Sequence, residues 1–150
     1  MNKDERILFT PAKIGNVTIK NRFVRSATFE NAAGKDGSIG GEYIKIYDTL
    51  SKGETGLIIT GMIHTGDEGR SYHRQAGLHS DEMISAFLAM NDKVHRNGSK
   101  IFAQLCQGGR QSNVLGLRPG APSTGMIDLI YRVYPRPMQN REILSAIQSF

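Results

Sequence analysis

Short apolar runs, separated by polar and glycine-rich segments, dominate the first two thirds of the chain. Three of these runs have the length of buried strands and cover residues 22–29, 55–62 and 99–106. Each is a nearly continuous apolar stretch rather than a strict alternation, which is typical of strands that are buried on both faces. The pattern therefore predicts a parallel sheet covered by helices.

Apolar residues at helical spacing predict amphipathic helices after each strand. The first helix begins near Glu42 and ends at Gly53, a residue type that commonly terminates helices. A second helix is predicted over residues 81–98, with Ser80 as its N-cap. A third begins near Asn140 and continues to the last residue. Strands and helices thus alternate along the chain.

This alternation, preceded by a hairpin predicted over residues 8–23, is typical of an α/β fold. Two architectures fit: a doubly wound open sheet and part of a (β/α)8 barrel. A doubly wound nucleotide-binding domain would carry a G-x-G-x-x-G turn after its first strand, and the sequence has none. In both architectures ligands bind beyond the carboxyl ends of the strands.

Composition narrows the class of protein. The 150 residues include a single cysteine, Cys106, which excludes an internal disulfide and any multi-cysteine metal site. The net charge of +5 comes from scattered Lys and Arg residues without a basic run, so we expect no nucleic-acid partner. The N-terminus is charged and no apolar run is long enough to cross a bilayer. We expect a cytoplasmic protein without a membrane partner.

Small and polar residues end the three predicted strands and are the candidate ligand-binding groups. Gln104 is the most informative, because an amide both donates and accepts and so suits the edge of a heterocycle. From the residues alone, Gln104 could equally brace loop backbone, and Gly61 could only mark close packing. Among the four histidines, His64 lies nearest to a strand end. No lysine stands at such an end, which argues against Schiff-base chemistry.

Several fragments together resemble the old yellow enzyme family of flavin-dependent oxidoreductases. They are "LFTPAKIGNVTIKNRFVRSATFE", "GLIITGM", "LHSDEMI" and "GSKIFAQLCQGGRQ", in this order. The resemblance implies a (β/α)8 TIM barrel that binds FMN at the carboxyl ends of its strands. It also implies hydride transfer from NADH or NADPH to the flavin and then to a small-molecule substrate, an activated alkene or similar acceptor.

Carried over by position, the resemblance implies a set of cofactor-binding residues. Backbone of one segment would follow the isoalloxazine ring, Gly61 and Met62 would lie near its carbonyl edge, and Gln104 would bond its pyrimidine edge. The first segment comprises Ser26, Ala27, Thr28 and Phe29. Asn31 falls where a substrate-facing residue often lies. Phe29 is a departure, since many members carry Thr or Cys there. No catalytic residue and no metal ligand is assigned.

The chain is short for this fold, because a full barrel takes about 250 residues. We therefore expect residues 1–150 to be the N-terminal portion of a flavin-binding barrel, a hairpin plus about three β/α units. Such a fragment would bind FMN weakly or not at all, would be inactive, and would self-associate through its open sheet edges. Two alternatives are a non-catalytic α/β module that acts by binding a partner, and a barrel enzyme of other chemistry, such as a phosphate-binding aldolase.

Overall fold

A three-stranded parallel sheet forms the centre of the molecule. The computed structural model describes residues 6–112, 114, 118–123 and 125–150. The strands are β3 (Val24–Arg25), β4 (Leu57–His64) and β5 (Lys100–Cys106), in the order β3-β4-β5. Both pairings are parallel. The prediction of a parallel sheet is confirmed.

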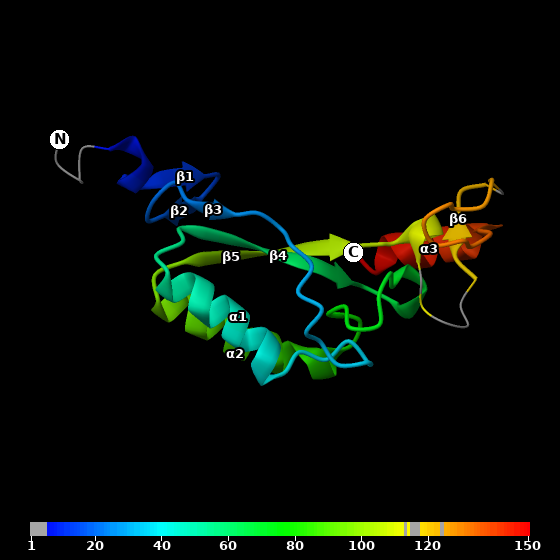
Figure 1. Cartoon of the computed structure of the whole chain (residues 1–150), viewed down its shortest axis with the longest axis horizontal. Helices are drawn as coiled ribbons and strands as arrows, with labels where there is room; N and C mark the ends of the chain where they lie inside the picture. The colour runs from blue at the N-terminus through cyan, green and yellow to red at the C-terminus, as the bar shows by residue number, and fades with distance from the viewer. Residues whose placement is uncertain (1–5, 113, 115–117, 124) are drawn as a thin grey trace.

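Two helices cover one face of this sheet, namely α1 (Gly41–Lys52) and α2 (Ile84–Arg96) (Figure 1). The apolar core lies between them and the sheet. It includes Tyr43 and Tyr47 of α1, Phe87, Met90 and Val94 of α2, and Ile58 and Ile63 of β4. Burial of these large side chains supplies most of the driving force for this packing.

The start of α2 differs from the sequence prediction. Ser80 introduces a short 3-10 turn, Asp81–Met83, and the α-helix begins only at Ile84. The Ser80 side chain makes no capping hydrogen bond. Two of the apolar residues expected on the buried face, Ile84 and Leu88, are exposed. The buried face of α2 therefore contains fewer residues than the apolar positions of the helix would suggest.

The first strand is much shorter than the predicted span of residues 22–29. Only Val24 and Arg25 pair with β4, and the Val24 side chain is 49% exposed. Beyond Arg25 the chain leaves the ladder and reaches Asn31, whose φ of 52° lies in the left-handed region that Asn tolerates. The apolar run predicted a longer strand than the structure contains. An apolar pattern does not show how many of its residues form hydrogen bonds with the neighbouring strand.

The N-terminal segment forms the predicted hairpin. It consists of η2 (Ile7–Phe9), β1 (Ala12–Ile14) and β2 (Val17–Ile19), and the two strands are antiparallel. Gly15 occupies the turn with a positive φ of 55°, as the sequence suggested. The hairpin lies at the amino end of the sheet, opposite the carboxyl ends of β4 and β5 (Figure 1).

The last third of the chain gathers beyond the carboxyl ends of β4 and β5 (Figure 1). Its elements are η5 (Gly109–Gln111), the parallel pair β6 (Gly120–Ala121) and β7 (Arg136–Pro137), and α3 (Asn140–Gln148). The N-cap of α3 is Gln139 rather than the predicted Asn140, and Gln139 forms a capping box with Glu142. A further 3-10 turn, η3 (Asp67–Gly69), follows β4.

Across the described ranges, no helix has the length and hydropathy that a membrane crossing requires.

Candidate functional site

A β-bulge in β4 sets the geometry at the carboxyl end of the sheet. The pairing with β5 shifts between Ile59 and Met62, so β4 carries one residue more than β5 over this stretch. The Thr60 hydroxyl accepts a hydrogen bond from the Gln104 N–H at 2.9 Å and donates one to the Gly61 carbonyl at 2.9 Å. As a result, Met62 pairs directly with Gln104.

The segment after β3 runs against this bulge. A Cβ built on Gly61 would lie 2.5 Å from the Thr28 carbonyl oxygen and would also meet the Glu30 carboxylate. The missing side chain of Gly61 thus makes room for Thr28 and Glu30, which is the close packing that the sequence offered as one interpretation of this glycine. The structure thus brings together the three segments that the sequence singled out. We call Ser26–Phe29, Met62 and Gln104 the strand-end edge.

Most residues of this edge reach solvent. Ser26, Thr28 and Gln104 are exposed, as is the neighbouring Asn31, and Gly61 is buried. Ala27, Phe29 and Met62 are partly exposed. The apolar run around Gln104 suggested a buried strand, which is wrong at this position.

The Gln104 side chain is available to a ligand. Within the described part of the chain, its amide makes no hydrogen bond, so the reading in which it braces loop backbone finds no support. Hydroxyl and amide groups on adjacent strand ends match the mixed donors and acceptors of a flavin ring edge. The residues present therefore fit that group.

An aromatic cluster borders the edge. The Phe29 ring packs on Tyr72 with centroids 4.6 Å apart and an interplanar angle of 30°. The Tyr72 and Tyr131 hydroxyls share a hydrogen bond of 2.5 Å, which raises the pKa of Tyr131. Asp128 holds the Tyr131 turn by accepting the backbone N–H groups of Ile130 and Tyr131. Sequence reasoning missed this cluster because its members lie on three loops without periodicity.

His64 and Cys106, at the ends of β4 and β5, are not arranged as ligand-binding groups. His64 is fully buried and stacks on His79 with ring centroids 4.9 Å apart. Burial, followed by the nearby His79, lowers the pKa of His64 to about 4, so its ring is neutral at pH 7. Burial also raises the pKa of the Cys106 thiol, which keeps it protonated.

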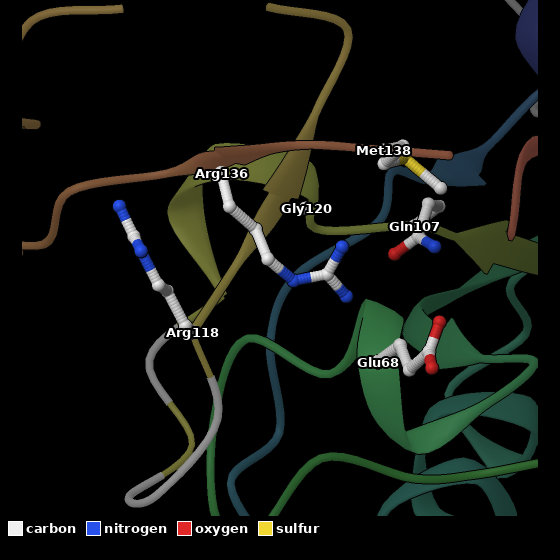
Figure 2. A pocket seen from close by; sticks show the side chains of 6 residues that line it. All are labelled: Glu68, Gln107, Arg118, Gly120, Arg136 and Met138. Atoms are coloured by element: carbon white, nitrogen blue, oxygen red, sulfur yellow. The ribbon is translucent and has the colours of Figure 1, made fainter. Parts of the chain in front are cut away.

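A small pocket lies next to the strand-end edge, beyond β5 (Figure 2). Its lining residues are Glu68, Gln107, Arg118, Gly120, Arg136 and Met138. In Figure 2 the Arg136 guanidinium points toward Glu68 and Gln107. Arg136 is already paired with both Glu142 oxygens, at 2.8 and 2.6 Å. The cavity of about 160 Å³ is smaller than most ligand pockets.

Curated relatives match nearly the whole chain. An NADH oxidase of Thermoanaerobacter brockii is 33% identical over 147 residues, which are 95% of this chain and 22% of that protein. An NADPH dehydrogenase of Bacillus velezensis is 33% identical over 146 residues, covering 97% of this chain and 43% of that protein. The chain thus spans less than half the length of these relatives.

Solved structures of old yellow enzymes and related reductases share the fold of this chain. The old yellow enzyme homologue from Zymomonas mobilis superposes with a TM-score of 0.82 at 28% identity, over 96% of this chain and 43% of that one. A 2-naphthoyl-CoA reductase superposes with a TM-score of 0.89 at 23% identity, over 95% and 24%. The sheet and its helices therefore correspond to part of the barrel of these enzymes.

The sequence profile of the NADH:flavin oxidoreductase / NADH oxidase family matches residues 7–150. This match covers almost the entire chain, and the relatives carry the corresponding names. The chain belongs to this family of flavoproteins, the old yellow enzymes, which use FMN with NADH or NADPH as reductant.

Proposed function

We propose that the chain supplies the strand-end edge of the FMN site in an oxidoreductase that passes hydride from NADH or NADPH to an activated alkene or similar acceptor. The observation that carries this proposal is the direct pairing of Met62 with Gln104, beside the Ser26–Phe29 segment. In a parallel sheet, the carboxyl ends of adjacent strands are where ligands bind.

FMN, when bound, supplies the hydride-accepting and hydride-donating chemistry. The contribution of the chain is to bind and orient it. Gln104 is exposed, and its side chain has no hydrogen-bond partner among the described residues, so it offers an amide that donates and accepts at the pyrimidine edge. The extended Ser26–Phe29 segment offers backbone along the ring, and Asn31, just beyond it, faces the acceptor. Preorganised donors at this edge stabilise the negative charge that the reduced ring carries.

The remaining parts of the site belong to other portions of the barrel in this proposal. Residues 1–150 are its N-terminal portion, and the isolated chain has no turnover. Among the described residues β5 pairs only with β4, so its second edge is available for pairing. The isolated chain then self-associates through this edge, because unpaired N–H and C=O groups form a template for another strand.

Titration of the 150-residue chain with FMN tests the proposal. Binding is followed by backbone NMR shifts up to millimolar FMN, with size-exclusion chromatography alongside. We expect weak but saturable binding, with shifts at Ser26–Phe29, Met62 and Gln104. Gln104→Ala should weaken binding at least fivefold, because one charge-assisted or neutral hydrogen bond contributes about 1 kcal/mol. Gln148→Ala, which removes an exposed amide of α3, is the control.

One outcome would overturn the proposal, namely saturable binding with shifts confined to residues outside the strand-end edge, unaffected by Gln104→Ala. It would leave the family membership intact and would remove this edge from the flavin site. A folded chain that shows no saturable shift at millimolar FMN would show instead that the other portions of the barrel are needed for binding.

A further inference from the structure

Glu30 is a buried carboxylate that nothing in the sequence analysis anticipated. Its side chain is 3% exposed and lies between α1, the β4 bulge and the segment after β3. It accepts a hydrogen bond from the Tyr47 hydroxyl at 2.5 Å and one from the Gly61 N–H at 3.0 Å. Arg25 forms an ion pair with it at 3.6 Å. A buried charge of this kind is costly unless it is paired, so its place calls for an explanation.

The bulge explains why Glu30 accepts a hydrogen bond from the Gly61 N–H. Because the ladder is interrupted at Thr60 and Gly61, the Gly61 N–H needs a partner that is not a strand carbonyl. The Gly61 N–H donates to the Glu30 carboxylate at 3.0 Å and also to the Tyr47 hydroxyl oxygen at 3.2 Å. The absence of a Cβ at Gly61 is what allows the carboxylate to approach. Thr60 and Glu30 therefore hold the bulge from opposite sides.

The groups around Glu30 leave it as the negative charge nearest to the bulge. Burial raises the pKa values of Tyr43 and Tyr47, so both phenols stay neutral and Tyr47 donates to the carboxylate. The Arg25 guanidinium is shared between the Glu30 carboxylate and the Ile59 carbonyl, to which it donates a hydrogen bond at 3.2 Å. The carboxylate contacts the backbone of Gly61, the residue before Met62 of the strand-end edge, so it lies close to that edge.

We propose that Glu30 is a positioning residue of the FMN site, which fixes the β4 bulge through the Gly61 amide, and that its charge favours the oxidised flavin over the reduced one. This inference rests on the proposed function. Its first half concerns the bulge alone and is measurable without flavin. Its second half follows because a carboxylate held close to the strand-end edge would oppose the negative charge that reduction adds to a ring bound at that edge.

Two substitutions of Glu30 distinguish its role in fixing the bulge from the effect of its charge on the flavin. Glu30→Ala removes both the charge and the acceptor, whereas Glu30→Gln keeps an amide oxygen for the Gly61 N–H. Hydrogen exchange of the Gly61 amide should accelerate at least tenfold in E30A and stay close to wild type in E30Q. Exchange at Ile58, inside the regular part of β4, is the internal reference. Should E30A not fold, Glu30→Asp shortens the side chain, which withdraws the carboxylate from the Gly61 N–H, and should accelerate Gly61 exchange to a smaller degree.

The charge is tested by titrating the chain with oxidised FMN and, without oxygen, with reduced FMN. In E30Q the affinity for reduced FMN should rise relative to oxidised FMN by roughly tenfold, which equals about 30 mV for a two-electron couple. Glu54→Gln makes the same change of net charge at an exposed site, 81% accessible and paired with Lys20. It should leave the ratio of the two affinities unchanged.

The exchange experiment tests the positioning role of Glu30, and the ratio of FMN affinities tests the effect of its charge. Unchanged Gly61 exchange in E30A, or in E30D if E30A does not fold, overturns the positioning role. Equal affinity ratios in E30Q and E54Q overturn the charge effect, even where FMN binds. If the wild-type chain binds no FMN, the charge effect fails for this chain, and Gly61 exchange still confirms or refutes the positioning role.

Discussion

The hydroxyl of Thr60 accepts the backbone N–H of Gln104 at 2.9 Å, across the bulge that separates β4 from regular pairing. Thr60 is buried, with 1% of its surface exposed, so water cannot replace it. A side chain thus takes the place of a strand carbonyl in the ladder. The backbone position of Gln104, the amide that we assign to the flavin ring, depends on this one hydroxyl.

Thr60→Val should therefore destabilise the fold by about 1–3 kcal/mol, because it leaves the part-buried Gln104 N–H without its acceptor at nearly constant volume. Urea denaturation at pH 7 measures the loss. Thr49→Val makes the same change on the exposed side of α1 and should alter the free energy of unfolding by less than about 0.5 kcal/mol. Equal effects of the two variants would contradict the role of the hydroxyl.

Gly61→Ala should cost about 1–3 kcal/mol, since the new methyl group meets the Thr28 carbonyl and the Glu30 carboxylate. Gly41→Ala is the matched control, because a Cβ at that position in α1 meets nothing within 4 Å. It should be neutral or slightly stabilising, as Ala favours helix over Gly. Thermal unfolding of both variants gives the comparison, and a loss of stability in Gly41→Ala as large as in Gly61→Ala would count against a steric cause.

The sequence predicted the elements that depend on local pattern. The hairpin around Gly15, the parallel strands 57–64 and 100–106 and the helix that ends at Gly53 follow from apolar runs and turn residues. The length of β3 could not be predicted, because it depends on how many residues β4 can pair.

The interior of the candidate site depended on contacts distant in sequence. Residues at the strand ends were identified because topology alone brings such ends together. The network around Glu30 was not identified, since Glu30 meets Tyr47 and Gly61 across 17 and 31 residues. A charged residue at the end of an apolar run looks like a solvated group until its partners are known.

Stability should fall in mild acid because of His64. Its pKa is about 4 in the fold against 6.5 for an ordinary histidine, so the unfolded chain binds the proton more readily. The stabilising contribution is complete above pH 6.5 and is lost as the pH falls toward 4, by at most about 3 kcal/mol.

Urea denaturation at pH 7 and pH 4.5 measures this dependence. Carboxylates titrate over part of the same range, so the comparison is between variants. His64→Gln should show a smaller difference between the two pH values than wild type. His95→Gln, at an exposed position of α2, should behave as wild type. The same difference in all three proteins would exclude His64 as the source.

Tyr72→Phe should loosen the turn around Tyr131 while it keeps the ring that packs on Phe29. The lost hydroxyl removes the hydrogen bond to Tyr131, so amide exchange over residues 128–134 should accelerate severalfold. Global stability should change by about 1 kcal/mol or less. Tyr134→Phe, in an exposed ring of the same segment, provides the control. Unaltered exchange in Tyr72→Phe would show that other contacts hold this turn.

The extra residue in β4 also changes the parity of that strand. In a regular strand, Ile58 and Ile63 would point to opposite faces, since their positions in the sequence differ by an odd number. Both belong to the same core cluster under the helices. The insertion therefore inverts the in–out alternation halfway along the strand. Deleting one residue here would restore a regular strand and would rotate Met62 and its successors to the wrong side of the sheet.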